Sequence, residues 1–171
     1  MTIMKFCKYL DHEEGKLAAM ETQGESELEI PVNIFAEDGS DYSLEEGTIC
    51  ALDIEGEGYD IDVYTTKDEM SKNTRMAEFS MIPMGTFPLE PDDPDFTPQP
   101  TIIFCGKVLD ASKNPEPTPD TYNYRVEVKT LDLFLTLYLD SDEDIPVGAY
   151  IHGVAWLSAV IQRGDQNDDH S

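Results

Sequence analysis

The chain has 171 residues, 36 of them acidic and 11 basic, and its formal charge at pH 7 is −25. Hydrophobic residues make up 40% of it and aromatic residues 9%, which is too apolar for a disordered acidic chain. No run approaches the roughly 18 apolar residues of a transmembrane helix. The negative electrostatic field of such a chain also repels nucleic acid phosphates and anionic membranes. The composition therefore predicts a folded, acidic domain with a solvated acidic surface, and it favours a basic protein or cations over nucleic acid or membrane as a partner.

The first part of the chain is expected to be β-rich and irregular, with few short helices. Residues 1–100 carry 24 acidic and 6 basic side chains. Strands are expected at residues 1–9 and 28–36, and a hairpin at 48–54 and 59–65 around Glu55-Gly56-Glu57-Gly58. Short helices are expected at residues 11–21, where Asp11 would be the N-cap, and at 67–75.

Proline divides the chain into an N-terminal half, residues 1–100, and a C-terminal region, residues 101–163. The segment 86–100 holds five prolines mixed with aspartates. Because proline removes the amide donor and fixes φ, we expect an extended connector there. Residues 114–120 form a second proline-rich loop, and the tail 164–171 is expected to be disordered because it lacks apolar residues.

The C-terminal region has the alternation typical of β-strands. A strand with a glycine is expected at 101–109. In residues 122–130 the side chains of Tyr124, Val126 and Val128 share one face, and in 131–139 the leucines alternate with Phe134, Thr136 and Tyr138. These two strands are expected to form a tight hairpin at Leu131-Asp132. Residues 148–161 provide a further apolar strand, bent at Gly153.

This order of strands and glycines resembles the OB-fold, a five-stranded β-barrel. Gly106 lies in the long first strand, and Gly148 opens the fourth. The resemblance covers residues 101–161 and implies an OB-like antiparallel barrel packed with the N-terminal half. It departs from the family in two ways. Only about seven residues separate Leu139 from Val147, too few for the usual helix, and the fifth strand must come from the end of Trp156–Ile161 or from an N-terminal strand.

The resemblance also implies a ligand-binding face, because OB-folds bind ligands across strands two and three. The outward residues of the predicted hairpin supply bases for anionic groups and aromatic rings for stacking. They are Arg125, Lys129, Phe134, Thr136 and Tyr138. The alternative that the sequence slightly favours is that the N-terminal half packs on the face and buries Phe134 and Tyr138.

Motifs for catalysis, cofactors or metals are not evident. Cys7, Cys50 and Cys105 form no C-x-x-C pair, and we expect free, mostly buried thiols of a cytoplasmic protein. The spacing Asp140-x-Asp142-x-Asp144 opens like an EF-hand loop but lacks its later glycine and glutamate. The sequence therefore predicts no enzyme, no cofactor and no metal site.

Three functions remain, and the salt dependence of the binding affinity distinguishes them. The first is a non-enzymatic binding or interaction module of OB-like architecture. The second is an acidic inhibitor, an immunity-type protein or a nucleic-acid mimic that binds a basic protein through electrostatic complementarity. The third is a single-stranded nucleic-acid binder. The net charge disfavours the third, because such binding needs lysine and arginine at the phosphates.

Overall fold

A computed structural model describes the chain except for residues 25–28, 75–78, 87–95, 115–121 and 165–171. It is mainly β, with 59% of the described residues in strands and 5% in one helix. The described residues divide into two compact units: residues 55–82 and 102–156 form a barrel unit, and residues 1–54, 83–101 and 157–171 form a terminal unit. Neither unit is a continuous stretch, since each takes residues from both sides of residue 100.

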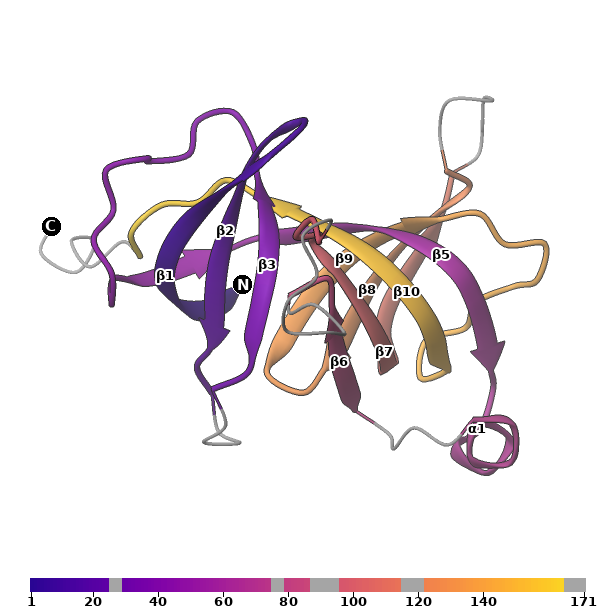
Figure 1. Cartoon of the computed structure of the whole chain (residues 1–171). Helices are drawn as coiled ribbons and strands as arrows, with labels where there is room; N and C mark the ends of the chain where they lie inside the picture. Colours follow the sequence, from indigo (N-terminus) through magenta and orange to yellow (C-terminus); the bar gives the residue numbers. More distant parts are fainter. Residues whose placement is uncertain (25–28, 75–78, 87–95, 115–121, 165–171) are drawn as a thin grey trace, which may run out of the picture. The chain divides into compact units, whose positions relative to one another are not determined.

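Ten strands and one helix make up the described part of the chain (Figure 1). In chain order they are β1 (Thr2–His12), β2 (Gly15–Thr22), β3 (Pro31–Ala36), β4 (Ile49–Leu52), β5 (Ile54–Tyr64), α1 (Lys67–Asn73), β6 (Ser80–Met84), β7 (Thr101–Lys113), β8 (Tyr124–Thr130), β9 (Leu133–Leu139) and β10 (Tyr150–Ala159). No described helix is long and apolar enough to cross a membrane.

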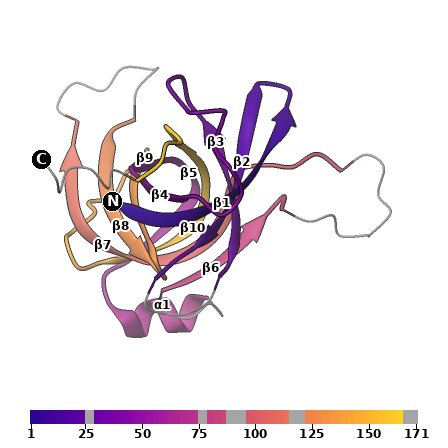
Figure 2. The same cartoon turned by 90° about the vertical axis from the view of Figure 1, so that its left-hand side faces the viewer.

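The barrel unit is a closed ring of five strands. The strand order runs β10-β5-β9-β8-β7, and β7 also pairs with β10, which closes the ring. In Figure 2 these strands curve around a common interior. β6 pairs with β7 outside the ring and is the edge strand on that side. It has five residues, and Pro83 within it carries no amide donor.

Alternation of side chains fills the barrel. Val126, Leu135 and Leu137 are at most 1% exposed, while their sequence neighbours face outward. The hairpin has the expected two-residue turn, since Thr130 pairs with Leu133. Leu131 in this turn adopts φ 47°, a left-handed conformation that a leucine side chain disfavours.

Two glycines allow neighbouring strands to approach closely. A Cβ atom on Gly106 would lie 2.6 Å from Val128 Cγ1 and 2.8 Å from the carbonyl oxygen of Lys129. A Cβ atom on Gly153 would lie 2.5 Å from Ile61 Cδ1. Because backbone as well as side chain would have to move, both positions require the absence of a side chain.

The terminal unit is a sheet with the order β4-β1-β2-β3, and the last residues of β10 pair in parallel with β3. The strands β1, β2 and β3 lie side by side in Figure 1. Met4, Leu17 and Ile34 form its core and are fully buried. A register shift in β1 between Phe6 and Lys8 marks a bulge at Cys7.

Two expectations for the N-terminal half were wrong. Residues 11–21 are not a helix: β1 extends to His12, and after a turn at Glu13-Glu14 the chain returns as β2, which Gly15 opens with a φ of 151°. Residues 48–65 are not a hairpin, because residues 54–64 are one continuous strand, β5, whereas β4 pairs with β1. The expected turn at residues 55–58 is therefore strand.

One further expectation for the N-terminal half is confirmed, and three proline-rich or terminal segments lie largely outside the described residues. The helix α1 is confirmed, with Thr66 as the N-cap accepting a hydrogen bond from the Glu69 amide at 3.1 Å. Most of the connector 86–100, the loop 114–120 and the tail 164–171 lie outside the described residues.

The side chain of Thr130, the last residue of β8, connects this strand to β6 and β7. Its hydroxyl is within 2.8 Å of the carbonyl oxygens of Ser80 and Cys105, and the residue is fully buried. Thr130→Val keeps the shape but removes the donor, so we expect the free energy of unfolding in urea to fall by about 1–3 kcal/mol. Thr130→Ser, which retains the hydroxyl, is the matched control, and equal losses in the two variants would contradict this role.

Candidate functional site

The five predicted site residues lie on one face of the β8–β9 hairpin, here called the outer face. The register pairs Arg125 with Tyr138 and Lys129 with Phe134, while Thr136 lies opposite Glu127. Since strand side chains alternate between faces, this register places all six on the side away from the barrel interior. The sequence alternation thus predicted correctly which residues come together.

One end of the outer face is a connected polar network. Arg125 Nη2 lies 3.1 Å from Glu127 Oε1, and the Thr136 hydroxyl donates to Glu127 Oε2 at 2.9 Å. The Tyr138 hydroxyl donates to Glu55 Oε2 of β5 at 3.1 Å. A hydrogen bond with Tyr138 and, next, the charge of Glu127 raise the pKa of the Arg125 guanidinium. The charge of Arg125 is therefore already compensated within the face.

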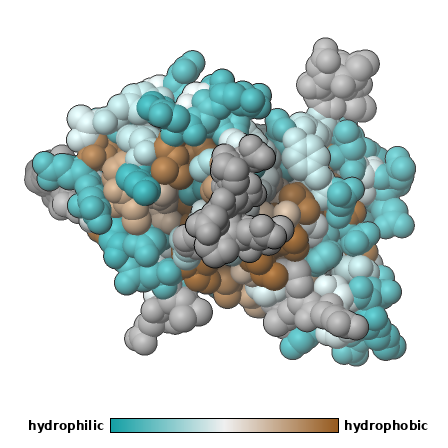
Figure 3. All heavy atoms as spheres, in the orientation of Figure 1, coloured by the Kyte–Doolittle hydropathy of each residue, from teal (hydrophilic) through white to brown (hydrophobic). Residues whose placement is uncertain are grey.

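The other end is aromatic. Lys129 Nζ lies 5.7 Å from the ring centroids of both Phe79 and Phe134, a cation–π arrangement. Phe134 is 41% exposed, so the expectation that it is buried was wrong, whereas Tyr138 is half-buried beside Glu55. Exposed Ile82 lies on the edge strand β6. Figure 3 shows hydrophobic atoms gathering over β6 and the β8–β9 turn.

A cavity of about 470 Å³ opens at the end of the hairpin opposite this turn. It is lined by three tyrosines, two basic residues and two small polar residues: Tyr122, Tyr124, Tyr138, Lys113, Arg125, Ser112 and Asn114. The register brings them together, because Ser112 pairs with Arg125 and Lys113 with Tyr124. Sequence analysis missed this cavity, having assigned Tyr124 only to the barrel interior.

Acidic side chains line a second cavity of about 510 Å³, which includes Asp62, Asp140 and Asp142. The neighbouring carboxylates serve the fold: Asp140 accepts a hydrogen bond from the Asn123 amide at 3.0 Å, and Asp144 accepts one from the Tyr124 hydroxyl at 3.2 Å. In the part of the chain that the structure describes, no group of three or more His, Cys, Asp or Glu residues is arranged to hold a metal ion.

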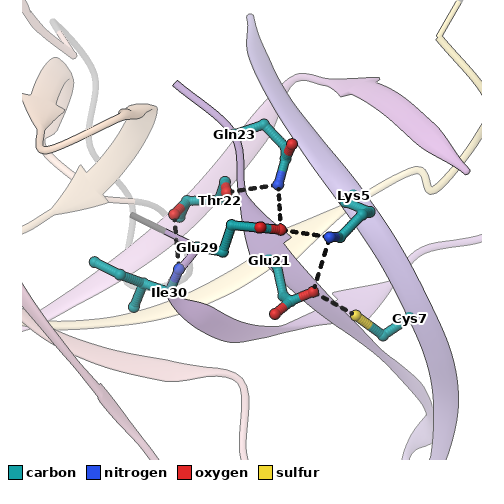
Figure 4. Close-up of polar contacts among 7 residues, drawn as sticks. All are labelled: Lys5, Cys7, Glu21, Thr22, Gln23, Glu29 and Ile30. Atoms are coloured by element: carbon teal, nitrogen blue, oxygen red, sulfur yellow. Dashed lines mark hydrogen bonds and ion pairs between the residues drawn. The ribbon is translucent and has the colours of Figure 1, made fainter. Parts of the chain in front are cut away.

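Cys7 belongs to a polar cluster on the terminal unit (Figure 4). Its thiol donates to Glu21 Oε1 at 3.4 Å, and Glu21 also lies 3.4 Å from Lys5 Nζ, which in turn binds Glu29. Burial and then the hydrogen bond to Glu21 raise the pKa of Cys7 to about 11. Because the thiolate is the nucleophile, this arrangement suppresses thiol reactivity.

All three cysteines are free, as expected, but only two are buried. Cys50 and Cys105 are buried, whereas Cys7 is partly exposed at the bulge of β1. Burial raises the pKa of both buried thiols to about 11 as well.

Comparisons with known proteins identify no relative of this chain. No protein-family model matches it. No curated protein matches its sequence. No solved structure matches its fold.

Cys7 gives a direct test of the polar cluster. At pH 8 we expect its alkylation by iodoacetamide to be on the order of a hundredfold slower than that of a free cysteine, because little thiolate is present. Glu21→Gln should lower the pKa of Cys7 and speed the reaction several-fold. Glu29→Gln, which removes a carboxylate that does not contact the thiol, is the control. The alkylation rate is monitored by mass spectrometry. A wild-type Cys7 that reacts at the rate of a free cysteine would refute the suppression of thiol reactivity.

From the two basic residues of the outer face we predict that the protein does not bind single-stranded DNA. The face offers two cations, Arg125 and Lys129, and the Glu127 carboxylate paired with Arg125 repels a phosphate there, so it can supply two phosphate contacts at most. Typical binders use about six to ten phosphate contacts. Fluorescence anisotropy of a labelled oligothymidine should therefore show no micromolar binding at about 150 mM salt. Such binding, if lost in Phe134→Ala/Tyr138→Ala, would show that the face does bind nucleic acid.

Proposed function

We propose that the protein is a non-enzymatic binding module with an OB-like barrel, and that its ligand binds on the outer face of the β8–β9 hairpin. The strand order supports the OB-like assignment. With β7, β8, β9 and β10 as the first four strands and β5 as the fifth, the first strand pairs with the second and the fourth. The fifth then lies between the third and the fourth, which is the Greek-key order of an OB barrel.

The glycine positions support the same assignment. Gly106 lies in the long first strand of this scheme, β7, where it faces Val128 and Lys129 of β8. Gly148, with φ 89°, precedes the fourth strand, β10. The scheme draws its fifth strand from the N-terminal half, one of the two sources that sequence analysis left open. It departs from the family in that no described helix lies between β9 and β10.

The observation that carries the binding proposal is the composition of the outer face. In a chain of charge −25, it combines two basic residues with an exposed aromatic ring and an ordered polar network. Exposed aromatic and arginine side chains are enriched where proteins bind ligands and partners. In OB-folds, strands two and three form the binding face, and here these are β8 and β9.

A second candidate function is binding of a basic protein, as an acidic inhibitor, an immunity-type protein or a nucleic-acid mimic would do. The excess of 36 acidic over 11 basic residues favours it. Electrostatic complementarity of this kind accelerates association and makes affinity fall steeply with salt. The first function differs in that it depends on Phe134 and Tyr138 and little on ionic strength.

Fragment mapping by NMR tests the outer face and does not require the ligand to be identified first. Small aromatic and polar fragments collect at sites built for ligands, so we expect their amide shift changes to cluster on β8 and β9. Phe134→Ala/Tyr138→Ala should remove these changes, while Val147→Ala, at a 64% exposed position outside the face, should retain them. Changes that cluster on other strands, or that persist in the double variant, would argue against the proposal.

A further inference from the structure

The terminal unit repeats the strand order of the barrel unit. In the terminal unit β1 pairs with β2 and with β4, and β2 pairs with β3. The chain from Ser158 to Arg163 completes the order, since it begins beside β3 and ends in a bridge between Arg163 and Cys50 of β4. With this stretch as a fifth strand, the order of β1, β2, β3 and β4 matches that of β7, β8, β9 and β10 around β5.

A matched pair of hydrogen bonds identifies equivalent residues in the two units. The amides of Gly47 and Gly148 donate to the carbonyl oxygens of Phe6 and Val108, both at 2.8 Å. Both glycines have a positive φ, 91° and 89°, and each lies just before the fourth strand of its unit. The first strand shifts register directly after Phe6 in one unit and directly after Val108 in the other. These two residues therefore occupy the same place.

The register extends this equivalence to the outer face. From Phe6 and Val108 it runs through the second strand to the third in both units. It places Phe35 of β3 where Tyr138 of β9 lies, and Asn33 is on the same face as Phe35 because strand side chains alternate. This face of β2 and β3 is therefore the counterpart of the outer face.

The protein covers this counterpart face with its own chain. Asn33 is only 2% exposed, and its side-chain amide donates to the Gly85 carbonyl oxygen at 3.4 Å. The Gln99 amide donates to the same oxygen at 3.0 Å, and the Gln99 side chain lies 3.3 Å from His12 Nε2. Gly85 and Gln99 lie at the two ends of the proline-rich connector. The face is thus occupied by peptide from the connector ends.

The barrel unit has a cavity at the equivalent place. It is the cavity lined by Tyr122, Tyr124 and Tyr138, here called the tyrosine-lined cavity, with a volume of about 470 Å³. Tyr138 is the counterpart of Phe35, and Asn114, which also lines the cavity, has the place in β7 that His12 has in β1. Within the described residues, the barrel unit therefore has a cavity where the terminal unit holds Gly85 and Gln99.

Charge and ring surface indicate which peptide fits this cavity. The two charged residues that line it, Lys113 and Arg125, are both basic, and Lys129 lies further along the outer face. Glu127 is paired with Arg125, so the two lysines give the site a net positive charge. The connector has the complementary composition, with five prolines, four acidic residues and no basic residue in 86–100. Aromatic-lined grooves are also the surfaces on which extended proline-rich segments dock.

We infer that the tyrosine-lined cavity and the adjoining outer face bind an extended, acidic, proline-rich peptide of a partner protein, with the chemistry of this protein's own connector. Its prolines pack on the tyrosine rings, and its carboxylates pair with Lys113 and Lys129. The inference rests on the proposed function and deepens it, because it names the ligand class of the outer face.

The test is fluorescence anisotropy of a labelled synthetic peptide, with the sequence of residues 83–100, added to the intact protein. We expect saturable binding that weakens little with salt, because exposed ion pairs contribute little to affinity. A peptide with alanine in place of every proline should bind about tenfold more weakly, having lost the preformed extended conformation. Tighter binding of a peptide with lysine at the four acidic positions, of oligothymidine or of a neutral oligosaccharide would overturn the inference.

Variants of the protein locate the binding. Tyr122→Ala should weaken it about tenfold, the effect of losing one aromatic contact. Lys113→Gln, at an exposed position, should slow association several-fold, whereas Lys72→Gln, which removes an exposed charge from α1, is the matched control and should not. Binding that survives Tyr122→Ala unchanged would overturn the inference.

NMR distinguishes the cavity from exchange with the connector. Peptide-induced amide shifts should lie on β8 and β9. Shifts on β2 and β3 instead would mean that the peptide displaces the protein's own connector, and would overturn the inference. Absence of peptide binding would overturn it as well, while fragment shifts on β8 and β9 would still support the proposed function independently.

Discussion

Closure of the barrel is the constraint on which the rest of the barrel unit depends. β10 must pair with β5 on one side and with β7 on the other, and only then does the ring have no open edge of its own. Gly153 makes the first pairing possible, since a Cβ atom there would collide with Ile61 of β5. Gly106 does the same where β7 meets β8. The outer face and the tyrosine-lined cavity are therefore positioned by two residues that have no side chain.

Local alternation predicted the hairpin and hence the outer face, but it could not predict the partners of β5. A period of two assigns Arg125 and Tyr138 to the outside regardless of which strand lies next to them. The neighbours of β5, in contrast, are separated from it by long stretches of sequence. The glycines at 56 and 58 suggested a turn, whereas Gly58 lies within an extended strand beside Leu139. A glycine in the sequence looks the same whether it lies in a turn or allows close approach of a neighbouring strand.

The cavity shows a second limit of reading faces from alternation. Tyr124 was assigned to the interior and is indeed 6% exposed, yet it also lines a cavity together with Arg125 from the opposite face. Within a sheet the backbone separates alternate side chains onto opposite faces. Beyond the end of a strand this separation is lost, so side chains from both faces can line the same cavity. Phe79 and Glu55, which complete the outer face, come from distant segments and had no signal of their own in the sequence.

The short edge strand β6 has a consequence for the behaviour of the protein at high concentration. An unpaired strand edge offers backbone donors and acceptors to any other extended chain, and Ile82 beside it is 54% exposed. Pro83 interrupts that row of donors within a strand of only five residues. Like charge on every copy, at −25 each, adds a repulsion that acts before two edges can meet. The proline, the short strand and the charge each disfavour pairing of β6 with a second copy, while the apolar surface over β6 stays exposed.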